Sequence, residues 1–228
     1  MEKKFQAEMG MLKSAILFVI FLIYTDLVCV FDVKPIGPTG TKVGFAAVNQ
    51  FFVKHIGVHA VFYTVTDLFA LLTFLVILTF AVIGFIQLVK RKNFFRVDPG
   101  IIMMAVFYVL IAAFYFLFEK IVINYRPVLI DGVLEASYPS SHTMLVVAVI
   151  WAALIEAKSL LGNNKKALTA VTVIGAVIIA AAVIGRILAG VHWFSDIIGS
   201  LILSAFLVYF YCTLVKVYDI IICKKLKK

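Results

Sequence analysis

The run LFALLTFLVILTFAVIGFIQLV, residues 68–89, decides the fold class because its 22 residues include no charged side chain. An α-helix needs about 20 apolar residues to cross the hydrocarbon core of a bilayer. Further uncharged runs of about this length lie at 101–118, 167–185 and 197–215. Their apolar residues are continuous and do not alternate with polar ones, so they predict spanning helices and not the strands of a β-barrel.

Two weaker runs raise the expected number of spanning helices to six. Residues 13–31 are apolar apart from Asp26, and residues 142–161 are apolar until Glu156. We expect the first run to be an uncleaved helix and not a signal peptide, because no small-x-small cleavage site follows it. The sequence therefore predicts an all-α fold, a single membrane domain over residues 1–228. Its helices are expected at about 13–31, 59–89, 101–120, 142–161, 167–187 and 195–217, with an amphipathic outer segment at 43–56.

The composition agrees with a membrane protein. Apolar residues make up 64% of the chain and charged residues 14%, and the mean hydropathy is +1.11. A soluble domain is nearer half apolar and a quarter charged, so a disordered chain, a disulfide scaffold and an ordinary cytosolic enzyme are excluded. The net charge of +9 does not indicate nucleic-acid binding, since no basic stripe lies on a soluble element. Membrane lipids are the expected partners, and the oligomeric state is left open.

The positions of the basic residues predict the orientation in the membrane. Fifteen of the 21 Lys and Arg residues lie at the two termini and in the second and fourth loops. The positive-inside rule places these parts in the cytoplasm, and the first, third and fifth loops outside. The compact size and the absence of any Asn-x-Ser/Thr sequon favour a bacterial plasma membrane.

Five polar side chains lie near the outer ends of the expected helices, where polar groups are costly and usually functional. They are Arg126, His142, Arg186, His192 and Asp196. His192 and Asp196 are four residues apart on one helix face, so the carboxylate can hold one ring N–H and leave the other nitrogen free to attack. The arginines suit phosphate oxygens, and His142 can protonate a leaving oxygen. This set predicts phosphoryl transfer that needs no metal ion.

Plainer interpretations exist for individual residues. Arginines at helix ends often reach toward lipid headgroups, and the acidic residues Asp26 and Asp67 are expected to have structural roles. His55 and His59 have the i, i+4 spacing of a metal pair. No further Cys or His lies in that loop, so we expect neither a metal site nor a cofactor.

Three blocks resemble the signature of the type-2 phosphatidic acid phosphatase superfamily, the lipid phosphate phosphatases. The family patterns are Lys-x6-Arg-Pro, Pro-Ser-Gly-His and Ser-Arg-x5-His-x3-Asp. The corresponding blocks here are Lys120-x5-Arg126-Pro127, Pro139-Ser140-Ser141-His142 and Gly185-Arg186-x5-His192-x3-Asp196. The third block keeps Arg, His and Asp at the family spacing. In the first block, Glu119 stands at the lysine position and Lys120 is one residue late, a rotation of about 100° around a helix.

The resemblance implies a role for each matched residue. His192 would form a phosphohistidine, Asp196 would orient it, and His142 would protonate the leaving group and later activate water. The phosphate contacts would come from Arg126, Arg186, Ser140 and Ser141, with Lys120 as a further candidate. The implied substrate is a membrane lipid phosphate or diphosphate: undecaprenyl diphosphate, phosphatidylglycerol phosphate or phosphatidic acid. The alternatives are a lipid phosphotransferase that uses the same residues and a non-catalytic membrane protein of the same fold.

Overall fold

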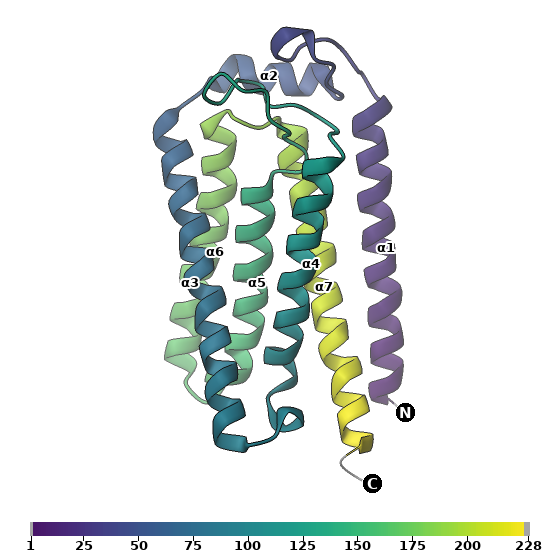
Figure 1. Cartoon of the computed structure of the whole chain (residues 1–228), viewed down its shortest axis with the longest axis vertical. Coiled ribbons are helices and arrows are strands. Elements are labelled where there is room, and N and C mark those ends of the chain that lie inside the picture. The colour runs from purple at the N-terminus through teal and green to yellow at the C-terminus, as the bar shows by residue number, and fades with distance from the viewer. Residues whose placement is uncertain (1, 226–228) are drawn as a thin grey trace.

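The computed structural model describes residues 2–225 and consists of helices joined by short loops (Figure 1). In chain order the elements are α1 (Glu2–Val30), η1 (Pro38–Gly40), α2 (Ala46–Ile56), α3 (Ala60–Arg91), η2 (Phe94–Arg96), α4 (Pro99–Lys120), α5 (Ser141–Leu161), α6 (Lys165–Ala189) and α7 (Phe194–Lys225). Within the described residues, α1 and α3–α7 are the six helices long and apolar enough to cross a membrane. The predicted all-α class with six spans is therefore confirmed. The side chains of Lys3, Lys224, Lys225, Lys227 and Lys228, which entered the count of basic residues, lie outside the described part.

Helices α5 and α7 form the centre of the bundle. In the apolar 18-residue stretch of each of these two helices, half of the residues are buried, compared with 11–22% in the corresponding stretches of the other four spanning helices. Helix α5 packs against α3, α4, α6 and α7, and α7 also packs against α1 and α4. Small residues allow the close contact between α1 and α7, since a Cβ atom on Gly10 would lie 2.7 Å from the Thr213 hydroxyl oxygen. In the other four helices most residues of the apolar stretch are exposed or only partly buried.

Two helices continue beyond the expected apolar runs. The first helix begins at Glu2 and not near residue 13, and the last continues to Lys225 and not to residue 217. Hydropathy marks only the part of a helix that lies in the hydrocarbon. A helix can extend into the headgroup region because its backbone hydrogen bonds are formed within the helix itself.

The amphipathic segment forms α2, which lies across one end of the bundle (Figure 1). The Asn49 amide donates a hydrogen bond of 2.9 Å to the Ser195 hydroxyl, and the Ser195 N–H donates to the Asn49 side chain at 3.0 Å. The Phe52 and Phe194 rings stack with their centroids 4.0 Å apart. These contacts hold α2 against the first turn of α7, which carries Asp196 of the third sequence block.

The loop between α4 and α5 folds into a small hairpin at the same end of the bundle. Antiparallel bridges pair Tyr125 with Ala136 and Ile130 with Val133. Asp131 and Gly132 have φ angles of 49° and 78°, as in the two-residue type I′ turns for which Asp-Gly is a preferred sequence. The hairpin brings the first and second sequence blocks close together.

Candidate active site

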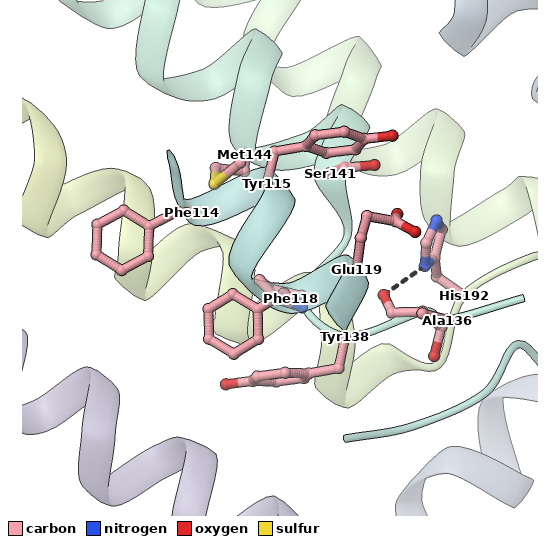
Figure 2. A pocket seen from close by; sticks show the side chains of 11 residues that line it. Phe114, Tyr115, Phe118, Glu119, Ala136, Tyr138, Ser141, Met144 and His192 are labelled. Carbon is pink, nitrogen blue, oxygen red and sulfur yellow. Dashed lines mark hydrogen bonds between the residues drawn. The ribbon is translucent and has the colours of Figure 1, made fainter. Parts of the chain in front are cut away.

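His192 lies in the turn between α6 and α7. Its Nδ1 atom is 3.0 Å from the Ser137 carbonyl oxygen (dashed line in Figure 2). Because a carbonyl can only accept a hydrogen bond, Nδ1 carries the ring proton and Nε2 carries the free lone pair. Nε2 is buried and has no hydrogen-bond partner among the described residues. Burial, together with the charges of Arg186, Arg126 and His142, holds the pKa of the His192 ring well below its usual range, so the ring is neutral at pH 7.

Asp196 contributes in a different way from the one expected from its spacing. Its Oδ2 atom lies 3.9 Å from His192 Nδ1, which is too long for a hydrogen bond. The fully buried carboxylate instead accepts hydrogen bonds of 3.0 Å from the Asn124 amide and from the Trp193 N–H. Asp196 therefore holds the turn that carries His192, while the Ser137 carbonyl fixes the ring tautomer.

Arg186 and His142 are in direct contact. Arg186 is 1% exposed, and its Nη2 atom lies 3.0 Å from His142 Nδ1. Its Nη1 atom donates to the Thr66 hydroxyl at 2.7 Å, and its guanidinium carbon lies 5.1 Å from the centre of the Tyr63 ring. The His142 Nε2 atom lies 3.1 Å from Asp67 Oδ1. The second and third blocks thus meet near the amino-terminal end of α3.

Arg126 lies on the hairpin and is 8% exposed. Its Nε atom is 3.0 Å from the Glu135 carboxylate, and its backbone N–H donates to the Glu135 carbonyl oxygen. The Nη1 atom is buried, and no described residue forms a hydrogen bond with it. A buried guanidinium with an unpartnered nitrogen is available to bind an anion.

A cavity of about 500 Å³, called the outer cavity because it lies toward the end of the bundle that carries α2 and the hairpin, brings Arg126 and His142 together. A narrow crevice, shown in Figure 2, contains His192. The two hollows share the lining residues Tyr115, Glu119, Ala136 and Ser141. The two hollows therefore adjoin each other, with Arg126 and His142 lining one and His192 lining the other. Arg186 contacts the His142 ring, and Asp196 holds the turn that carries His192.

The remaining phosphate-binding candidates differ in their positions. Ser141 lines both hollows, whereas Ser140 is fully buried and its hydroxyl bonds to the Thr143 hydroxyl at 3.0 Å. Lys120 is exposed and is not among the residues that line either hollow. Glu119 lines both, and Figure 2 shows its carboxyl group pointing toward His192. A carboxylate thus faces the region where the family motif has a lysine.

Several residues of the site were not predicted as site residues. Asp67 is the sole acidic residue between positions 60 and 91, and a lone charge in a spanning helix is a usable signal of function. Asn124 and Thr66 carry no such signal, because uncharged polar residues are common at helix ends and in loops. The role of Ser137 depends on its backbone carbonyl, which any residue would supply. Among the described side chains, no group of three or more His, Cys, Asp or Glu residues could hold a metal ion.

Comparisons with known proteins give two matches. The sequence profile of the PAP2 superfamily matches residues 101–218, which include all three blocks. The fold is similar to the crystal structure of the first transmembrane PAP2 type phosphatidylglycerolphosphate phosphatase from Bacillus subtilis, with a TM-score of 0.60 and 22% sequence identity. That alignment covers 91% of this chain and 96% of the other. At this identity the likeness concerns the fold. A search of curated protein sequences found no match.

Proposed function

Because the chain belongs to the PAP2 superfamily of type-2 phosphatidic acid phosphatases, we propose that it removes the terminal phosphate of a membrane lipid phosphate or diphosphate through a phosphohistidine on His192. One observation carries this proposal. The Nε2 atom of His192 has a lone pair and no partner among the described residues, and His192 lines a crevice that adjoins a cavity containing Arg126 and His142. A neutral imidazole beside cationic groups suits attack on phosphorus.

The reaction would proceed in two displacements. The Nε2 lone pair forms a bond to phosphorus, the bond from phosphorus to the lipid oxygen breaks, and that oxygen takes a proton from His142. In the second step His142 takes a proton from water, whose oxygen attacks phosphorus and releases His192. Arg126 and Arg186 balance the charge of the phosphoryl oxygens. The ring becomes cationic in the phosphorylated state, and the Asp196 carboxylate, 3.9 Å away, favours that charge.

A lipid can reach this region from the side of the bundle. An apolar cavity of about 430 Å³ lies between α3, α4 and α5, with Phe74, Ile111 and Leu145 among its lining residues. It shares Tyr115, Ser141 and His142 with the outer cavity. A hydrophobic tail in the apolar cavity would therefore place its phosphate in the outer one. The distribution of basic residues supports an outward-facing site in a bacterial plasma membrane.

The experiment measures phosphate release by the purified full chain from phosphatidic acid, phosphatidylglycerol phosphate and undecaprenyl diphosphate. His192→Ala should abolish release, and His55→Ala is the matched control because His55 is exposed and bonds only to the Phe51 carbonyl oxygen. Rapid acid-free quenching of a reaction with labelled substrate should trap phosphate on the wild type and none on His192→Ala. Release that persists in the His192 variant would overturn the nucleophile assignment. A lipid acceptor added to the same assay reveals transfer in place of hydrolysis.

A further inference from the structure

Asp67 is a carboxylate of the site to which the motifs assign no role. It lies at the outer end of α3, and its side chain is 41% exposed. Its Oδ1 atom is 3.1 Å from His142 Nε2 and 3.4 Å from Arg186 Nη1. Acidic residues are costly in a spanning helix, so one that contacts both a histidine and an arginine of the site indicates a functional role.

We propose that Asp67 is a positioning residue, which holds His142 in the tautomer and orientation that protonate the leaving lipid oxygen. This inference rests on the proposed function of the same site. The geometry that carries it is the position of the His142 ring between two charged partners, the Arg186 guanidinium on Nδ1 and the Asp67 carboxylate on Nε2.

The tautomer follows from the chemistry of the two partners. A guanidinium has only donors, so Arg186 Nη2 donates to His142 Nδ1 and that nitrogen is unprotonated. The ring proton is then on Nε2, from which it is donated to Asp67 Oδ1. A ring held at both nitrogens cannot rotate without breaking two charge-assisted hydrogen bonds. Nδ1 is therefore the nitrogen left to take up and release a proton once Arg186 no longer donates to it.

Substrate binding explains how that proton is used. When phosphoryl oxygens attract the Arg186 guanidinium, Nδ1 is released and takes up a proton from a hydronium ion of the solvent in the outer cavity, which becomes water. That proton passes to the leaving oxygen, and the proton of the attacking water later returns to Nδ1. Throughout the cycle Nε2–H stays bonded to Asp67, whose negative charge offsets the two nearby arginines around a cationic ring.

The dependence on the leaving group separates this role from a structural one. Alkoxide departure from a lipid phosphate needs a proton, whereas p-nitrophenolate departs without one. General acid catalysis contributes about 10²–10⁴-fold. Asp67→Ala should therefore lower kcat for a lipid phosphate by about 10²-fold, with little change in KM and less than about threefold change in kcat for p-nitrophenyl phosphate.

Variants of the same two positions sharpen the test. Asp67→Asn keeps the size and an acceptor oxygen but removes the charge, so its loss of kcat on the lipid should be intermediate, and Asp67→Glu should restore part of it. His142→Ala should give the same contrast between the two substrates, and the double variant should be no worse than His142→Ala alone. Asp26→Asn, at an exposed acidic position near the outer end of α1, is the matched control.

The outcomes are distinguishable. Equal losses on both substrates in folded Asp67→Asn, established by an unchanged elution volume and unfolding temperature, would show a structural role and overturn the inference. Unchanged kcat on the lipid would overturn it as well. If the wild type releases phosphate from neither substrate, the proposed function itself fails. Selective loss on the lipid phosphate, shared with His142→Ala and absent from Asp26→Asn, supports the inference.

Discussion

Arg186→Lys is the substitution that tests most directly how the site handles phosphate, because it keeps the charge and removes the planar fork. Arg186 uses Nη1 for the Thr66 hydroxyl and Nη2 for the His142 ring. A lysine has a single nitrogen at the end of a flexible stem and cannot serve both partners. It would also be placed in a site where the present side chain is 1% exposed.

The expected magnitude follows from these contacts. One charge-assisted hydrogen bond is lost, which is worth about 1.5–3 kcal/mol. Because 1.4 kcal/mol corresponds to a factor of ten in rate, kcat/KM should fall by about 10- to 100-fold. Much of this loss should appear in kcat, since the planar fork holds His142 and is proposed to bind the phosphoryl oxygens, whose charge changes during phosphoryl transfer.

The assay is steady-state phosphate release from the preferred lipid phosphate. Arg91→Lys is the matched control, because Arg91 lies at the other end of α3 and pairs with Asp98 at a partly exposed position. Its kcat/KM should stay within about twofold, as expected for an exposed ion pair. If Arg186→Lys is as active as wild type, the fork is not needed and the assignment of Arg186 to the phosphate is refuted.

Four other predictions concern the site and its supports. Lys120→Ala should cost much less activity than Arg126→Ala, since only Arg126 lines the outer cavity; equal losses would show that Lys120 reaches the phosphate. The pKa of His192 is held well below its usual range, so unfolding takes up a proton below about pH 6.5 and stability falls there. The unfolding temperature should thus drop more steeply from pH 7 to pH 5 in the wild type than in His192→Ala, and equal slopes contradict this. Activity should survive treatment with a chelator, and a loss restored by magnesium would point to metal-dependent chemistry. Gly190→Ala should lower activity at least tenfold, because Gly190 has a φ of 68° and an added Cβ atom would clash with the Gly57 carbonyl oxygen and displace the turn of His192. The control is Gly40→Ala, which is also at positive φ but has open space around it. Similar activities of the two variants would contradict this prediction.

Glu119 gives the site a charge pattern that differs from the family motif. Its carboxyl group and that of Glu135 both line the outer cavity, together with Arg126 and His142. Lys120, the nearest basic residue in the first block, is exposed and lines neither hollow. A rotation of about 100° separates adjacent helical side chains, which accounts for Glu119 lining the hollows while Lys120 does not.

The amino-acid sequence alone determined the features that depend on short, continuous stretches of the chain. Six apolar runs define six spans because the bilayer imposes a fixed minimum length on each. His192 and Asp196 lie on one stretch of chain, so their spacing could be read directly. The family blocks are short patterns of this kind, and the profile match over residues 101–218 includes all of them.

Only the tertiary structure decided which atoms meet. The contact between Arg186 and Asp67 joins residues 119 positions apart, and it depends on how α3 and α6 are rotated against each other. The tautomer of His192 depends on the carbonyl oxygen of Ser137, 55 positions away, a group that every residue carries and no pattern reveals. Side-chain identity sets what chemistry is possible, but helix packing and backbone position select the partner of each nitrogen, because hydrogen bonds act over about 3 Å and require alignment.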